Sequence, residues 1–213
     1  YNREGRGFLL DFSPEINYHK HYINRYAFLF NEYIGNKYVY LPELSLRHTG
    51  QKTFQFDNSH KTIALYLGGE NKEFRKYPDE YAVQLLRLLN RQGYNLLLIG
   101  DENDNIKHTQ YAEEARIDHL INLTARTTIE GFINTIANVD LIITIDSSAL
   151  HIAAAVKTPF IALMGLSTSP TSTILPKVPL GRILKIENNL IREEDYIRNI
   201  TPDLILKTIS ELI

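Results

Sequence analysis

The sequence predicts an α/β fold built on a doubly wound parallel sheet. From residue 61 onward, short runs rich in leucine and β-branched residues alternate with amphipathic helical patterns, as in successive βαβ units. The runs are largely continuous in apolar character, which is typical of strands buried on both faces of a sheet. With 213 residues, of which 44% are hydrophobic and 23% charged, the chain is long enough to bury a sizeable core.

Six apolar runs are expected to form the strands. Each has the length of a strand, and helical patterns or turns separate one run from the next. The expected strands are Thr62–Leu67, Tyr94–Ile99, His119–Leu123, Leu141–Ile145, Pro159–Leu163 and Ile183–Ile186.

Helix start and stop signals lie between these strands. Pro78, which is followed by two acidic residues, begins one helix, and Gly93 ends it. A second helix is expected to open with Thr127-Thr128-Ile129-Glu130, in which Thr127 and Glu130 have the spacing of a capping box. The last helix begins at Thr201-Pro202-Asp203 and its pattern extends to Leu212.

The first sixty residues differ in kind from the rest. They hold one helical pattern, roughly His19–Ile34, and then the linker-like stretch Pro42–His60, which has few apolar residues. We therefore divide the chain into residues 1–60, a sheet domain of residues 61–200 and a C-terminal helix of residues 201–213. The chain starts with Tyr1 rather than Met, so we expect it to be a piece of a longer protein.

Charge and cysteine content limit the possible partners and locations. The formal net charge is −2 and the sequence pI is about 6.4, so nothing indicates nucleic-acid binding or unaided binding to an anionic membrane. The absence of cysteine fits a reducing compartment, and we expect a cytoplasmic protein. The apolar runs are too short to span a bilayer.

Several catalytic and cofactor motifs are absent. The sequence has no Gly-x-Gly-x-x-Gly fingerprint, no Walker A loop, no Gly-x-Ser-x-Gly elbow and no His-Glu-x-x-His pair. The spacing His19-x-His21 is weak support for a metal site and is better explained by surface histidines. We therefore predict neither a metal site nor a bound cofactor.

The stretch Ile145-Asp146-Ser147-Ser148-Ala149-Leu150-His151 carries the clearest functional signal. Asp146 is expected at the carboxyl end of a central strand, with Ser147 and Ser148 forming the turn into a helix, and open α/β sheets bind ligands at such strand ends. The helix N-terminus and the hydroxyls favour a phosphate, and His151 shares a helix face with Ser148. The alternative is that Asp146 and Ser147 only cap the helix and that His151 is structural.

Two further strand ends carry candidate residues. Leu67-Gly68-Gly69-Glu70-Asn71 leaves the first strand, where paired glycines let the backbone approach a ligand, and Arg75-Lys76 follows with charges that could meet phosphates. Gly100-Asp101-Glu102-Asn103-Asp104 leaves the second strand and offers carboxylates for a ribose hydroxyl. The alternatives are an ordinary surface loop and an acidic helix start.

Taken in this order, the three sites resemble the donor-binding half of glycosyltransferase family 9, the heptosyltransferases of lipopolysaccharide core assembly. That family has a Pro-Gly-Ala-type turn, then Lys-x-Trp-Pro, a glycine with an acid four residues on, and Asp-(Thr/Ser)-Gly-x-x-His. The matching positions here are Leu67-Gly68-Gly69, Arg75-Lys76-Tyr77-Pro78, Gly100 with Asp104, and Asp146 to His151. The stretch Phe160 to Pro170 is also similar to the family's next strand and loop.

The resemblance implies the Rossmann-like C-terminal half of a GT-B enzyme, with residues 1–60 as a remnant of the acceptor domain plus linker. It implies inverting transfer of a sugar, typically heptose from ADP-heptose, to a lipopolysaccharide core or other glycan acceptor. It further implies no metal-dependent chemistry, at most peripheral contact with the inner membrane, and a catalytic base outside this chain. The candidate substrate-binding residues are Gly68, Gly69, Glu70, Asn71, Arg75, Lys76, Asp104, Thr128, Asp146, Ser147, Ser148, Ala149 and His151.

Three departures from the family pattern bear on the donor. Ser148 replaces a glycine, Arg75 replaces a lysine and Tyr77 replaces a tryptophan, which puts the donor sugar in doubt more than the class. Two other functions stay open on the sequence. One is a nucleotide-sugar-binding module without transfer activity, and the other is a GT-B-like enzyme such as a sugar-nucleotide epimerase.

Overall fold

The computed structural model describes residues 22–35, 45–56, 59–68, 76–165, 175–176, 178–186, 192 and 195–213. The chain divides into two compact units, Tyr1–Glu43 with Thr168–Leu175, and Leu44–Ser167 with Pro176–Ile213. In the first unit the described helix is α1, Tyr22–Ile34. The second unit contains the sheet, and it includes the C-terminal residues through Ile213.

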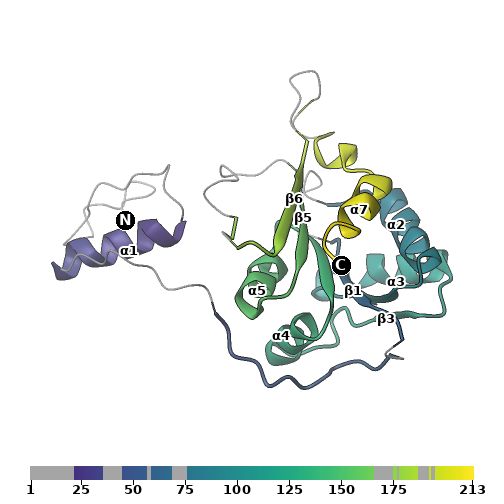
Figure 1. Ribbon diagram of the computed structural model, residues 1–213, viewed down its shortest axis with the longest axis horizontal. Helices are drawn as coiled ribbons and strands as arrows, with labels where there is room; N and C mark the ends of the chain where they lie inside the picture. The colour runs from purple at the N-terminus through teal and green to yellow at the C-terminus, as the bar shows by residue number, and fades with distance from the viewer. Residues whose placement is uncertain are drawn as a thin grey trace. The chain divides into compact units, whose positions relative to one another are not determined.

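The sheet has six strands, all parallel, in the order β3-β2-β1-β4-β5-β6 (Figure 1). All six strands predicted from apolar runs are present, with ends that differ by at most two residues. Every residue of β1, β2, β4 and β5 is buried, which explains their continuous apolar character. The strands are β1 Thr62–Tyr66, β2 Asn95–Leu98, β3 Leu120–Asn122, β4 Leu141–Ile145, β5 Phe160–Met164 and β6 Gly181–Lys185.

Helices cover both faces of the sheet. Helix α2 packs against α3 and α7 on one face, and α4 packs against α5 on the other (Figure 1). This division follows from the right-handedness of the crossover connections. The crossovers after β1 and after β4 run toward opposite edges of the sheet, so their helices lie on opposite faces. The helices are α2 Asp79–Arg91, α3 Asn105–Ala115, α4 Ile129–Ala137, α5 Ser148–Val156 and α7 Pro202–Ile209, with short 3₁₀ turns at Glu102–Asp104 and Ile197–Asn199.

Most of the predicted helix signals are confirmed. Helix α2 begins directly after Pro78, and Gly93 follows its end with a φ of +83°. Thr201 caps α7 by accepting a hydrogen bond from Leu204 N, although this helix ends at Ile209 and not at Leu212.

The predicted capping box of α4 is wrong. Thr128, not Thr127, is the N-cap, and its side chain accepts a hydrogen bond from Gly131 N. Because the cap lies one residue later than expected, the third helical position is Gly131, which has no side chain to complete a box with the N-cap. Glu130 therefore contributes only a negative charge in the first turn of the helix.

The linker-like residues 45–56 lie along the α4 and α5 side of the sheet. Leu46 N donates to Ala155 O at 3.1 Å, and Thr49 N donates to Asn134 Oδ1 at 3.1 Å. Thr53 Oγ1 pairs with Thr135 Oγ1. These hydrogen bonds, to α5 and then to α4, attach the segment to the sheet unit before it enters β1.

Candidate functional site

The order of the strands places a topological switch point between β1 and β4. The connection after β1 leads to β2, and the connection after β4 leads to β5. The chain therefore leaves the carboxyl ends of these two adjacent strands in opposite directions. Their register pairs Tyr66 with Thr144, so β1 and β4 end at the same edge of the sheet, and Asp146 follows directly after β4. Doubly wound sheets bind ligands in the crevice at this position.

A hydrogen-bond chain organises the turn after β4. Thr144 Oγ1 donates its proton to Ile145 O at 3.0 Å. In the 2.9 Å hydrogen bond between Thr144 Oγ1 and Ser147 Oγ, Ser147 is therefore the donor and Thr144 the acceptor. Ser147 Oγ also accepts from Ala149 N at 3.2 Å and caps α5. The Ser147 hydroxyl is therefore already occupied as a donor, and the exposed Ser148 hydroxyl is the better placed of the two to meet a ligand.

Asp146 has a different environment from the neighbouring serine. Its side chain is half-buried at the end of β4, and Ser147 takes the capping role that the structural alternative assigned to both residues. Within the described part of the chain, no hydrogen bond or ion pair engages the Asp146 carboxylate. A half-buried carboxylate that the described residues leave unpaired is suited to accept hydrogen bonds from a ligand.

The first turn of α5 completes this strand end. Ser148 and His151 are both exposed, and because they lie three residues apart within α5 they share one face of the helix. Ala149 and Ala153 are fully buried on the opposite face, so the helix lies close to the sheet. The N-terminus of this nine-residue helix offers backbone N–H groups and the positive end of its dipole to an anion.

The other predicted residues have varied positions. Thr128 caps α4, and Lys76 lines a cavity of about 170 Å³ together with Asp79, Lys107 and Arg198. Asp104 is buried, with 5% of its surface exposed, beside Gly68 and Gly100. Four of the predicted residues, Gly69, Glu70, Asn71 and Arg75, lie outside the described residues.

The start of α2 is held by a network that the sequence did not reveal. Lys107 and Tyr111, one turn apart on α3, both donate hydrogen bonds to the Asp79 carboxylate. Partial burial raises the pKa of Asp79, but these hydrogen bonds and the Lys107 charge outweigh it, and the pKa lies below its ordinary value of 3.8. The spacing Lys107 to Tyr111 was the available signal, because it puts both side chains on one helix face.

Tyr77, which stands where the family has tryptophan, is a buried structural residue. Only 1% of its surface is exposed, and its hydroxyl donates to Ile200 O at 2.9 Å. Burial raises the pKa of this phenol well above its ordinary value, so the hydroxyl stays protonated. Tyr77 thereby ties the entrance of α2 to the segment before α7.

His108 gives the fold a predictable dependence on pH. The ring is fully buried, Nδ1 lies 2.7 Å from Thr124 Oγ1, and Nε2 has no hydrogen-bond partner among the residues that the structure describes. Burial lowers the pKa of His108 to about 4, although the Asp104 and Asp101 carboxylates favour the protonated form.

Because the unfolded chain binds a proton near pH 6.5 and the folded chain does not, the free energy of unfolding should fall as pH decreases from 6.5 to about 4. The expected loss is about 3 kcal/mol, at about 1.4 kcal/mol for each pH unit. Denaturant unfolding across this range should show the slope in the wild-type chain and a flatter profile in His108→Gln. Parallel profiles of the two proteins would contradict this assignment.

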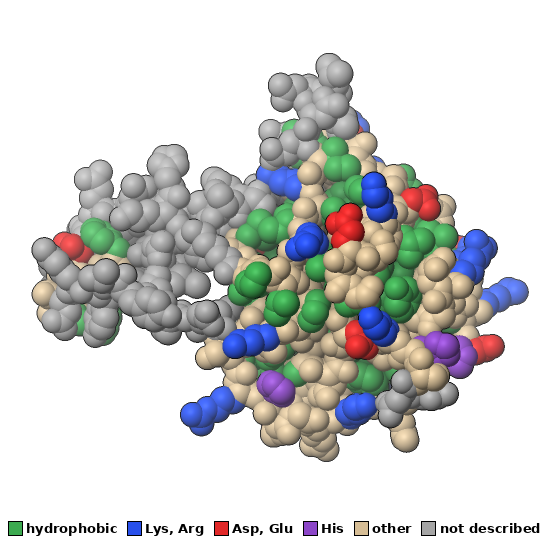
Figure 2. Space-filling view, viewed as in Figure 1, with side chains coloured by type: hydrophobic (Ala, Val, Ile, Leu, Met, Phe, Trp, Pro, Cys, Tyr) green, Lys and Arg blue, Asp and Glu red, His purple; other side chains and the backbone are tan. Residues whose placement is uncertain are grey.

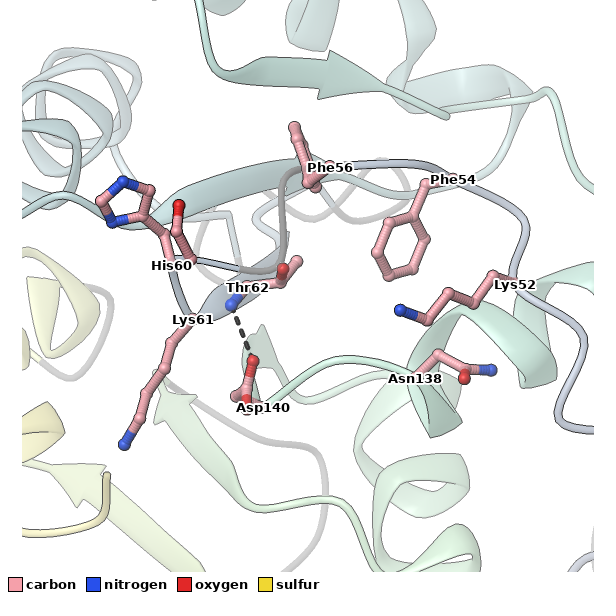
Figure 3. Close-up of a pocket in the computed structure, with 9 residues that line it drawn as sticks. Lys52, Phe54, Phe56, His60, Lys61, Thr62, Asn138 and Asp140 are labelled. Carbon is pink, nitrogen blue, oxygen red and sulfur yellow. Dashed lines mark hydrogen bonds between the residues drawn. The ribbon is translucent and has the colours of Figure 1, made fainter.

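A second cavity lies at the opposite edge of the sheet. It has a volume of about 330 Å³ and is found at the amino ends of β1 and β4, where Thr62 N donates to Asp140 Oδ2 at 2.7 Å (Figure 3). The side chain of Lys52 extends toward this hydrogen bond, whereas Lys61 points away (Figure 3). This cavity lies at the edge where the strands begin, so it is separate from Asp146 and the α5 N-terminus.

The described surface carries no feature that points to a membrane span or a metal centre. No helix in the described segments has both the length and the apolar character needed to cross a bilayer. No group of three potential ligands among these same segments is arranged to hold a metal ion. On the face shown in Figure 2, Lys and Arg side chains are spread among acidic ones and do not gather into one patch.

The strand order is that of Rossmann-type nucleotide-binding domains, and the polar strand ends lie where such domains bind their ligands. The chain belongs to glycosyltransferase family 9: the family model described as glycosyltransferase family 9 (heptosyltransferase) matches residues 2–194. The resemblance stated from the sequence motifs is thereby confirmed.

Individual relatives agree with this assignment. The chain is 31% identical to lipooligosaccharide heptosyltransferase 2 of Haemophilus influenzae over 163 residues, which cover 71% of this chain and 47% of the relative. The fold is similar to that of a family 9 glycosyltransferase from Veillonella parvula, with a TM-score of 0.77, 17% identity, and coverage of 93% of this chain and 62% of that one. It is also similar to the Escherichia coli heptosyltransferase WaaC with ADP, with a TM-score of 0.63, 18% identity, and coverage of 98% and 61%. The chain spans about half the length of the curated relatives it matches.

Proposed function

We propose that this chain is the donor-binding half of an inverting glycosyltransferase that transfers heptose from an ADP-sugar to a lipopolysaccharide core acceptor. The observation that carries the proposal is the Asp146 carboxylate, which has no partner among the described residues and lies beside the N-terminus of α5 at the switch point of the sheet. Family membership supports the reaction class, and the WaaC structure with ADP supports the nucleotide.

The two kinds of group at this strand end suit two parts of a sugar nucleotide. A carboxylate repels a diphosphate but accepts hydrogen bonds from hydroxyls, so we assign Asp146 to the hydroxyls of the donor sugar. The α5 N-terminus, the Ser148 hydroxyl and His151 are donors, so we assign them to the diphosphate. As the glycosidic bond forms, negative charge builds up on the departing diphosphate, and these donors would stabilise it without a metal ion.

The remaining parts of the reaction lie outside this site. Inversion requires an acceptor hydroxyl that attacks the anomeric carbon from the side opposite the diphosphate, together with a base that removes its proton. We assign both the acceptor surface and the base to a second domain. For such an acceptor, we propose that the complete enzyme works in the cytoplasm at the inner face of the inner membrane, with at most peripheral contact.

Calorimetry with ADP, UDP and GDP tests the donor assignment. We expect ADP to bind most tightly, and we expect His151→Ala to weaken ADP about tenfold through loss of one hydrogen bond to the diphosphate, equivalent to about 1.4 kcal/mol. His119→Ala is the matched control, because His119 is exposed at the amino edge of the sheet, directly before β3. Equally weak binding of all three nucleotides, unchanged in His151→Ala, would remove the proposed donor site.

A further inference from the structure

Tyr77 links three elements where the chain passes from β1 to α2. Its backbone N–H donates to Leu67 O at 3.4 Å, and Leu67 directly follows β1. Tyr77 also directly precedes Pro78, the N-cap of α2. Its phenol hydroxyl donates to Ile200 O at 2.9 Å, in the segment before α7. The end of β1 and the start of α2 are therefore held together at one residue, which the C-terminal segment also holds.

The acceptor of the Tyr77 hydroxyl is itself fixed. Ile200 is fully buried, and its N–H donates to Ile197 O at 3.1 Å in a 3₁₀ turn. On its other side lies Thr201, the N-cap of α7. Because a turn and a helix cap flank the Ile200 carbonyl, it provides a stable anchor for the phenol.

The backbone hydrogen bond of Tyr77 closes the connection between β1 and α2. This connection begins at Gly68 and ends at Lys76, and the structure describes both of these residues. Leu67 and Tyr77, the two residues joined by the hydrogen bond, lie immediately outside these ends. A connection whose ends are already fixed loses less conformational freedom when it binds a ligand.

We propose that Tyr77 is a positioning residue that fixes Gly68 and Lys76 for binding of the donor diphosphate. This inference rests on the proposed function. Tyr77 does not contact the ligand, because only 1% of its surface is exposed and its hydroxyl is bonded to Ile200 O. It acts through the Gly68 backbone, which a side chain does not shield, and through the Lys76 charge, which attracts phosphate. The C-terminal segment thereby supports donor binding from outside the site.

Affinities for ADP and adenosine, followed by amide NMR shifts, test this role. Tyr77→Phe removes the hydroxyl and keeps the ring, so the buried packing is retained. We expect the variant to bind ADP about threefold to tenfold more weakly, the range that one hydrogen bond contributes. Adenosine lacks both phosphates, so its affinity should not change.

The matched control is Thr158→Val. Thr158 is buried before β5, at the amino edge of the sheet, and its hydroxyl donates to Ile136 O at 2.8 Å. The control therefore also removes one buried hydrogen bond from a hydroxyl to a backbone carbonyl. It should leave the affinities for both ligands unchanged.

Hydrogen exchange on the wild-type chain without nucleotide gives a second test. The Tyr77 amide should be protected before ADP is added, because its bond to Leu67 O belongs to the free fold. Protection that appears only with ADP would overturn the proposal. Equal losses for ADP and adenosine in Tyr77→Phe, or no loss of ADP affinity, would also overturn it.

The proposed function can fail separately from this role. Absence of ADP binding by the wild-type chain would overturn the proposed function and the role of Tyr77 with it. Wild-type binding of ADP that Tyr77→Phe leaves unchanged would overturn only the role of Tyr77. Thermal melts identify a variant that fails to fold, and the exchange measurement on the wild-type chain then decides.

Discussion

Asp146→Asn is expected to lower kcat/KM of the complete enzyme by about 10²-fold or more, the range found when one preorganised electrostatic contact is removed from an active site. The carboxylate has no partner among the described residues, so its removal leaves the internal hydrogen bonds of the domain intact. The capping bond of α5 belongs to Ser147 and also survives. The loss should therefore appear in the kinetics, with the melting temperature little changed.

The chain provides a matched control at the other end of the same strand. Asp140 directly precedes β4, and its carboxylate accepts a hydrogen bond from Thr62 N at 2.7 Å. Asp140→Asn should lower the free energy of unfolding by about 1 kcal/mol and leave kcat/KM unchanged, because it weakens a structural hydrogen bond. An Asp146→Asn protein that is unfolded at room temperature, or one with wild-type kcat/KM, would show that Asp146 is not a donor-site residue.

The 213-residue chain alone is expected to bind ADP and to transfer no heptose. Its described residues form one Rossmann-type sheet with its helices. All the groups that we assign to binding of the sugar donor lie in that domain. General-base assistance contributes about 10²–10⁴-fold, and positioning of the acceptor contributes more, so the missing groups should reduce transfer below detection.

The measurement is transfer from ADP-heptose to a heptose-deficient lipopolysaccharide acceptor. The 213-residue chain is assayed beside a form extended upstream through a complete N-terminal domain. Only the extended form should transfer heptose to the acceptor. Comparable rates in the two proteins would move the catalytic base into residues 1–60, with His19 and His21 as the first residues to replace. Release of free nucleotide without an acceptor would instead favour the epimerase alternative.

The sheet and the position of the candidate site at its carboxyl edge could be predicted because both depend on local patterns. Continuous apolar runs identified the buried strands, and a polar stretch directly after Leu141–Ile145 identified the strand end at the switch point. Parallel topology then brought the carboxyl ends of β1 and β4 to the same edge of the sheet without further information.

The roles of individual side chains could not be predicted, because they depend on contacts between distant segments. Nothing in the sequence shows that Asp104 fills the space that a β-carbon at Gly68 would need. Nor does it show that Ser147 donates its hydroxyl proton to Thr144. The cavity at the amino edge combines Lys52 with Asp140, which only the folded chain brings together. The N-cap of α4 was assigned to the wrong threonine because Thr127 and Thr128 have the same side chain. Only the backbone conformation determines which of the two precedes the first helical residue.

The most direct test of the account is to map ADP binding on the wild-type chain residue by residue, by following backbone amide NMR shifts during a titration. We expect the largest shifts at the carboxyl edge, at Gly68 and at the residues from Asp146 to His151. Thr62 and Asp140, at the amino edge, serve as internal controls and should shift little. Shifts concentrated at Thr62, Asp140 and Lys52, with Asp146 and Ser148 unchanged, would contradict a donor site at the switch point of the sheet.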